Sequence, residues 1–99
     1  MSAIDAQVVF GDHPEIHLRG ELDAFAVPDV SRAVAYAAGA GNPHVVIDLA
    51  GVTFCDSAGL AALVEARRRA GTITLRRPSP AVERSMQKTG LDGTFPVQR

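Results

Sequence analysis

The sequence predicts an α/β fold with the element order β-β-α-β-α-β-α-(β), in which the last strand is short. The chain has 99 residues, which suffice for one hydrophobic core. After two initial β-prone runs, strand-like and helical apolar periodicities alternate, and turn-forming residues separate them. We therefore expect residues 1–99 to form a single domain, with a mixed four- to five-stranded sheet covered by helices.

The first elements are two strands and a helix. Residues 6–10 are β-prone and residues 15–19 alternate polar and apolar side chains, so the turn residues between them predict a hairpin. Gly20 is expected to close the second strand. The first helix is expected to start near Pro28, because proline suits the first helical position. It ends at three helix-terminating residues, Gly39, Gly41 and Pro43.

Strands and helices then alternate to the end of the chain. The strongest strand signal covers residues 45–49, followed by a predicted turn and a short apolar piece over 51–54. A second helix is expected to start near Asp56 and Ser57 and to stop at Gly71. The remaining elements are a strand over 72–75, a helix from Ser79-Pro80 to Gly90, and a short strand over 94–97.

This topology gathers three polar residues at one edge of the sheet. A right-handed crossover makes the strands at 15–19 and 45–49 parallel, so their carboxyl ends share an edge. Open α/β sheets place their functional crevice outside those ends. We therefore expect Asp23, Asp56 and Ser57 to lie close together.

Ser57 then has two interpretations. At a helix start, its hydroxyl can cap backbone N–H groups of the first turn. Alternatively it can carry a phosphate, because free N–H groups and the positive end of the helix dipole accept an anion. That group, with about −1.5 to −2 charges at neutral pH, would face Asp23 and Asp56 and act as a switch. Asp23 likewise either caps the start of the first helix or belongs to the binding surface.

Four motifs follow one another between about residue 6 and residue 95. They are Gly20-Glu-Leu-Asp23 before a proline-started helix, Val46-Ile-Asp-Leu49, Phe54-Cys-Asp-Ser-Ala-Gly-Leu60, and Pro78-Ser-Pro-Ala-Val82 leading to Thr89-Gly-Leu91. Together they resemble the STAS domain, and more narrowly the bacterial anti-sigma factor antagonists. Two features depart from that family: the helix ending at Gly71 is shorter than expected, and a final C-terminal helix is absent.

The resemblance implies a cytoplasmic binding protein without a cofactor, and not an enzyme. The unphosphorylated form would bind an anti-sigma factor that is also a serine kinase and holds the ATP, and thereby release a sigma factor. Phosphorylation of Ser57 would end the binding. The partner-binding residues implied for this chain are Asp23, Asp56, Ser57, Ala58 and Gly59.

The main alternative is a STAS accessory subunit of a phospholipid-trafficking ABC transporter, which never meets an anti-sigma kinase. A small serine hydrolase is disfavoured, because His13, His17 and His44 all precede Ser57 and because Cys55 stands where a nucleophile elbow needs glycine. Only the first two histidines have a metal-ligand spacing, so a metal site is not expected.

Bulk properties exclude further classes of function. The formal net charge of −1, and arginines at 67–69 and 76–77 without stacking aromatics, argue against direct binding of nucleic acid; we interpret these arginines as solvated. No apolar run approaches the roughly 18 residues that span a bilayer, and no signal peptide is evident. The single cysteine suits a reducing compartment.

Overall fold

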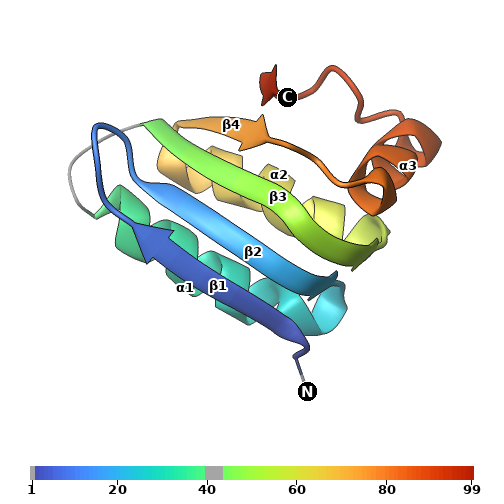
Figure 1. Ribbon diagram of the computed structural model, residues 1–99, viewed down its shortest axis with the longest axis horizontal. Helices are drawn as coiled ribbons and strands as arrows, with labels where there is room; N and C mark the ends of the chain where they lie inside the picture. Colours follow the sequence, from blue (N-terminus) through green and yellow to red (C-terminus); the bar gives the residue numbers. More distant parts are fainter. Residues whose placement is uncertain (1, 40–43) are drawn as a thin grey trace.

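The computed structural model describes residues 2–39 and 44–99 and has the predicted order of elements (Figure 1). Five strands form one sheet in the order β1-β2-β3-β4-β5. They are β1 (Ile4–Val9), β2 (Glu15–Leu22), β3 (His44–Cys55), β4 (Thr72–Arg76) and β5 (Val97–Gln98). β1 pairs antiparallel with β2, and the three remaining pairs of neighbouring strands are parallel, which confirms the hairpin and the mixed sheet. The helices are α1 (Val27–Ala38), α2 (Ser57–Ala70) and α3 (Pro80–Thr89), with a 3-10 turn η1 (Ala24–Ala26) before α1.

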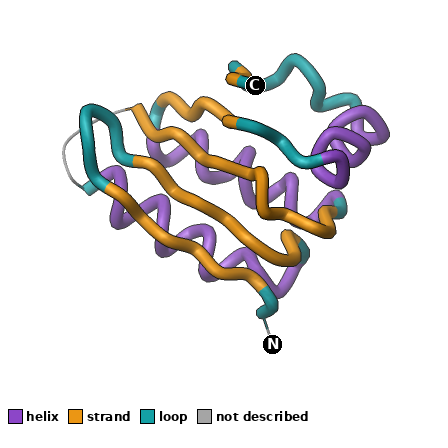
Figure 2. Tube along the Cα trace, in the orientation of Figure 1, coloured by secondary structure: helices purple, strands orange, loops and turns teal. Residues whose placement is uncertain are grey.

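Two layers form the molecule. Helices α1 and α2 cover one face of the sheet, and α3 lies at the end where β3 stops (Figures 1 and 2). Within the described residues no helix covers the opposite face or follows α3. The core fills the space between the sheet and the two covering helices, and each fully buried aliphatic side chain there contributes roughly 1.5–3 kcal/mol. Its largest members are Ile16, Leu18, Leu22, Ile47, Leu49, Leu60, Leu63, Ile73 and Leu75.

Strand β3 is longer than the sequence predicted. The expected turn after residue 49 does not occur, and the strand continues to Cys55. Glycine is required at position 51 because the Arg19 side chain on β2 packs closely against it: a Cβ at this position would lie 2.8 Å from Cγ of Arg19. Two register shifts, each of which adds one residue to β3 relative to β2, let the strands stay paired along this stretch.

Strand β2 also passes the residue expected to end it. Gly20 adopts a φ of +107° and pairs with Val52, and the strand continues to Leu22. A side chain at Gly20 would meet the carbonyl oxygen of Ala3 at 2.2 Å. The prediction that Gly20 closes β2 is therefore wrong: glycine is needed for a local distortion within the strand.

The helix boundaries follow the sequence signals closely. Pro28 is the second residue of α1, and Gly39 follows its end. The other predicted terminators, Gly41 and Pro43, lie outside the described residues. The Ser79 hydroxyl accepts a hydrogen bond from the backbone N–H of Val82 at the start of α3. Within the described residues, no helix combines the length and the hydropathy needed to cross a membrane.

The C-terminal segment shows that one of the arginines is not simply solvated. Arg67 of α2 donates to the carbonyl oxygen of Thr94 at 2.7 Å, and its guanidinium lies 4.9 Å from the ring centroid of Phe95. Phe95 is buried. These contacts hold Thr94 and Phe95 against α2, and β5 covers only Val97–Gln98 and not the predicted 94–97.

The helix-free face carries a network of ion pairs centred on Asp48, which is 3% exposed. Its carboxylate accepts hydrogen bonds from Arg76 at 3.1 Å, from Arg77 at 3.0 Å and from the backbone N–H of Ala50 at 3.0 Å. Burial raises the pKa of Asp48, but these hydrogen bonds outweigh burial and leave that pKa below its ordinary value. Arg76 also bonds Glu15, so the arginines at 76–77, interpreted as solvated from the sequence, cross-link three strands.

Candidate functional site at the carboxyl ends of β2 and β3

The carboxyl ends of β2 and β3 lie side by side. Leu22 pairs with Cys55 in the parallel register, and the backbone N–H of Asp56 donates to the carbonyl oxygen of Leu22 at 3.3 Å. Asp23 follows directly on one strand, and Asp56 and Ser57 follow on the other. The predicted crossover is therefore confirmed, and it brings these three residues to one edge of the sheet.

Asp56 caps helix α2. Its backbone is extended, and its Oδ1 accepts a hydrogen bond from the backbone N–H of Gly59 at 3.0 Å. Ser57 is then the first residue of the helix and is exposed. Its hydroxyl has no hydrogen-bond partner among the described residues. The capping interpretation of Ser57 is therefore wrong, because the aspartate before it performs that role.

The first turn of α2 sits directly on the end of β2. Gly59 is buried, and a Cβ there would lie 2.0 Å from the carbonyl oxygen of Leu22. Glycine at this position lets the helix start close to the neighbouring strand, which fixes the height of Ser57 above the sheet. Ala58 is half-buried beside it. Direct contact of Ala58 and Gly59 with a partner stays a prediction.

Asp23 has the structural role that the sequence left open. Its Oδ1 accepts a hydrogen bond from the backbone N–H of Phe25 at 3.0 Å, which caps the 3-10 turn η1. This turn continues into α1 without a break. Asp23 does not cap α1 itself, because the N-cap of that helix is Ala26 and no side chain caps it. Asp23 itself is half-buried.

Two exposed aromatic residues, missed from the sequence, flank these polar groups. Phe25 in η1 is 63% exposed and Phe54 near the end of β3 is 46% exposed. Strand alternation would place Phe54 on the same side as the buried Val52, but the register shift between the pairs Gly20–Val52 and Glu21–Phe54 interrupts that alternation and leaves Phe54 exposed. No sequence pattern indicates Phe25 either, because it falls in a turn that the sequence did not predict. Exposed aromatics grouped around polar residues are typical of protein-binding surfaces.

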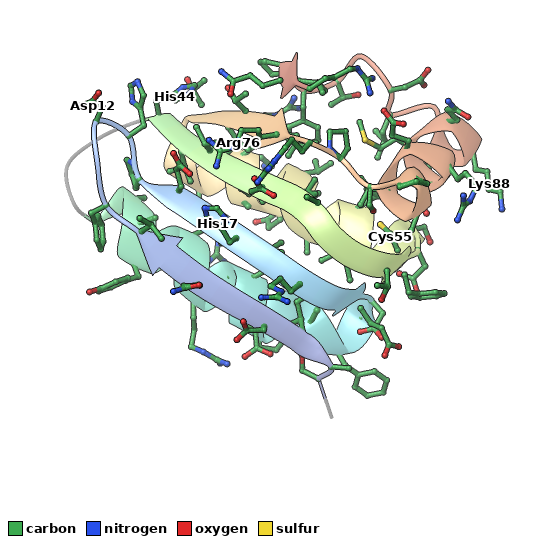
Figure 3. The ribbon with its side chains drawn as sticks, viewed as in Figure 1. Asp12, His17, His44, Cys55, Arg76 and Lys88 are labelled. Atoms are coloured by element: carbon green, nitrogen blue, oxygen red, sulfur yellow. The ribbon has the colours of Figure 1, made fainter. Side chains whose placement is uncertain are left out.

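A groove of about 310 Å³ opens beside Ser57. Residues 54–57 line one side, and Ser85, Lys88 and Thr89 of α3 line the other. Cys55 lies at this end of the sheet, and Lys88 projects from α3 nearby (Figure 3). Burial raises the pKa of the Cys55 thiol to about 11, so the thiol is protonated at neutral pH and is a poor nucleophile.

The histidines lie elsewhere. The rings of His13 and His44 are 4.8 Å apart, and His17 on the helix-free face contacts Glu15 at 3.2 Å. His44 begins β3, at the opposite end of the strand from Ser57. Across residues 2–39 and 44–99, no group of three or more acidic, histidine or cysteine side chains could hold a metal ion.

Comparison with known proteins gives consistent results. An anti-sigma factor antagonist from Mycobacterium paratuberculosis is 29% identical, with a TM-score of 0.82 over 96% of this chain and 85% of that one. An anti-sigma-factor antagonist (STAS) domain protein from Planctomyces limnophilus is 22% identical, with a TM-score of 0.74 over 94% and 88% of the two chains. The phosphorylated form of the Bacillus cell fate determinant SpoIIAA is 24% identical, with a TM-score of 0.66 over 98% and 92%.

No curated protein matches the sequence significantly. The family model described as "Mlab, STAS domain" matches residues 7–98, nearly the whole chain. The resemblance seen in the motifs is thus confirmed by the family model and by the fold: the chain belongs to the STAS domain family.

Proposed function

We propose that this chain is an anti-sigma factor antagonist whose binding is switched off by phosphorylation of Ser57. The unphosphorylated form binds an anti-sigma factor that is also a serine kinase, and this binding frees a sigma factor. One observation carries the proposal: Ser57 presents an exposed hydroxyl at the start of α2, and this hydroxyl does not cap the helix. It lies at the same edge of the sheet as Asp23, Asp56 and two exposed phenylalanines. The similarity to an anti-sigma factor antagonist over 96% of the chain supports it.

The chemistry of the switch is a phosphoryl transfer from ATP bound by the partner. A bond forms between Oγ of Ser57 and the γ-phosphorus, and the bond from that phosphorus to the oxygen of the β-phosphate breaks. ADP leaves, and the hydroxyl proton passes to a base of the kinase or to water. This chain supplies an accessible hydroxyl that has no hydrogen bond to give up among the described residues. The positive end of the α2 dipole favours the added anion.

The consequence for binding is electrostatic. A phosphate adds about −1.5 to −2 charges to an edge that already holds Asp23, Asp56 and Glu21. A partner that covers Phe25 and Phe54 must also remove that phosphate from water. This has a high cost in free energy unless a cation of the partner pairs with the phosphate. A hundredfold loss of affinity requires only about 2.8 kcal/mol.

We also propose that the chain works as a binding module and not as an enzyme. Three features support this. Asp56 is committed to capping α2, the Cys55 thiol is protonated, and His44 lies at the far end of β3 from Ser57. A serine hydrolase would need a base within hydrogen-bonding reach of the nucleophile.

The second candidate function is an accessory subunit of a phospholipid-trafficking ABC transporter. The observation that favours it is the description of the matching family model, which names Mlab and not an anti-sigma factor antagonist. In that role the same edge of the sheet would hold a partner ATPase permanently, and Ser57 would not be part of a phosphorylation cycle.

A binding experiment separates the two candidates. The purified chain is titrated with the anti-sigma kinase and with the transporter ATPase encoded nearest to its gene, each measured by calorimetry with and without ATP. We expect binding to the kinase that disappears as ATP is consumed. If the chain binds the ATPase but not the kinase, and ATP does not change this binding, the result would support the accessory role instead.

A further inference from the structure

Helix α3 is held firmly against the end of β3. The hydroxyl of Ser85, which is buried, donates a hydrogen bond of 2.5 Å to the carbonyl oxygen of Cys55. On the same helix, Val82 and Met86 are buried in the core. The helix therefore has a fixed position relative to Asp56 and Ser57, which directly follow Cys55 in the chain.

Lys88 faces the groove as a result of this anchoring. It lies three residues after Ser85, so the two side chains project from the same side of α3 on successive turns. Both line the groove beside Ser57 (Figure 3 labels Lys88 on α3). Lys88 is exposed, and it forms no ion pair with any residue that the structure describes.

The charges at this edge are otherwise acidic. Asp56 lines the groove with Ser57, and Asp23 and Glu21 lie at the adjoining end of β2. Lys88 is the one cationic side chain among the described residues of the groove wall. A phosphate on Ser57 would be repelled by the three carboxylates and attracted by the ammonium group across the groove.

We propose that Lys88 is the intramolecular counter-ion of phosphorylated Ser57 and draws the phosphate into the groove between α2 and α3. The proposal rests on the function proposed above, because it concerns the phosphorylated state. It adds a second component to the switch. Phosphorylation supplies negative charge, and it also pairs the Lys88 ammonium group, which in the unphosphorylated form can bind an acidic group of the partner. It also keeps the phosphate doubly charged near neutral pH, since a nearby cation favours the dianion.

The test uses the full chain with phosphoserine installed at position 57 during translation, so that no kinase is needed. The second pKa of the phosphate is measured by ³¹P NMR titration. We expect Lys88→Met and Lys88→Gln to raise this pKa by about 0.3–0.7 of a pH unit, as for loss of an exposed ion pair. Lys88→Arg should keep the wild-type value, because it keeps the charge.

Arg84→Met is the matched control. Arg84 is an exposed cation on the same helix, but it does not line the groove. We expect its removal to leave the phosphate pKa unchanged. The proposal is overturned if the Lys88 variants titrate like wild type, or if Arg84→Met shifts the pKa equally. Neither result depends on an anti-sigma kinase, so failure here is distinct from failure of the proposed function, which would show as absence of kinase binding.

Discussion

The backbone N–H of Asp56 donates a hydrogen bond of 3.3 Å to the carbonyl oxygen of Leu22, and this contact joins the ends of two parallel strands. A whole helix separates these residues in the chain. The contact sets Asp23 and Ser57 on the same edge of the sheet, and the position of every group in the candidate site depends on it. Residues that hold the two strand ends together should therefore matter for stability even when they touch no partner.

The buried glycine at the start of α2 gives the first prediction. Gly59→Ala should destabilise the protein by about 1–3 kcal/mol, because its Cβ would lie 2.0 Å from the Leu22 carbonyl oxygen and the helix must shift. Urea unfolding followed by circular dichroism measures the change. Gly11→Ala is the control, since a Cβ there has nothing within 4 Å. Equal stability of the two variants would contradict the close packing of α2 on β2.

The second prediction separates the two roles of Asp23. Asp23→Asn keeps the oxygen that caps η1 but removes the charge, so the unfolding midpoint should stay near wild type. Asp23→Ala should cost about 1 kcal/mol, because the hydrogen bond to Phe25 is lost.

Binding to the anti-sigma factor decides whether Asp23 also contacts the partner. We expect both Asp23 variants to weaken it, measured by calorimetry, while Asp92→Asn, at an exposed aspartate of the loop after α3, should bind normally. If Asp23→Asn binds and is phosphorylated like wild type, Asp23 is only a cap.

The third prediction concerns the exposed phenylalanines. Phe25→Ser should weaken binding of the anti-sigma factor at least about tenfold, or about 1.4 kcal/mol, since exposed aromatics at a binding surface commonly dominate its affinity. Its stability should change by less than about 0.5 kcal/mol, because the side chain is 63% exposed. Tyr36→Ser is the matched control: Tyr36 is 66% exposed and contacts Phe10 at a ring distance of 5.5 Å. An equal loss of affinity in both variants would place the binding surface elsewhere.

The fourth prediction is a dependence of stability on pH. The pKa of Asp48 in the folded protein lies below its ordinary value of 3.8. The unfolded chain therefore binds more protons near that pH, so the stabilisation is present above pH 3.8 and is lost as the pH falls through the folded-state pKa.

Asp48→Asn tests this dependence. The variant should be less stable than wild type by about 1.5–3 kcal/mol at neutral pH, because Arg76 and Arg77 lose a charged acceptor. The difference should shrink in acid, and urea unfolding across the acid range measures it. A difference that is constant with pH would show that the Asp48 carboxylate is not selectively stabilised by folding.

Much of the architecture could be predicted from local sequence patterns. The apolar alternation over 45–49 predicts a central strand, and the crossover rule then predicts that Asp23 and Ser57 share an edge. The failures have one physical origin, since each involves a contact distant in sequence. Gly51 was interpreted as part of a turn, yet it is glycine because the Arg19 side chain lies against it.

What was missed in the site has local causes as well as a contact distant in sequence. The 3-10 turn that puts Asp23 in a capping position has too few residues to show a periodicity. Ser57 was considered as a cap because it stands at a helix start, and only the backbone geometry shows that Asp56 is the cap. Lys88 reaches the groove through the hydrogen bond between Ser85 and Cys55, which no sequence pattern reveals.

The central claim is that Ser57 is the switch, and identification of the phosphorylated residue tests it most directly. The chain is incubated with its anti-sigma kinase and ATP, and peptides are sequenced by mass spectrometry. The account predicts one phosphate on Ser57 and none on the Ser57→Ala variant. Ser79 and Ser85 are buried and serve as internal controls. A phosphate on Thr53, Ser79 or Ser85, or undiminished phosphorylation of Ser57→Ala, would contradict the account.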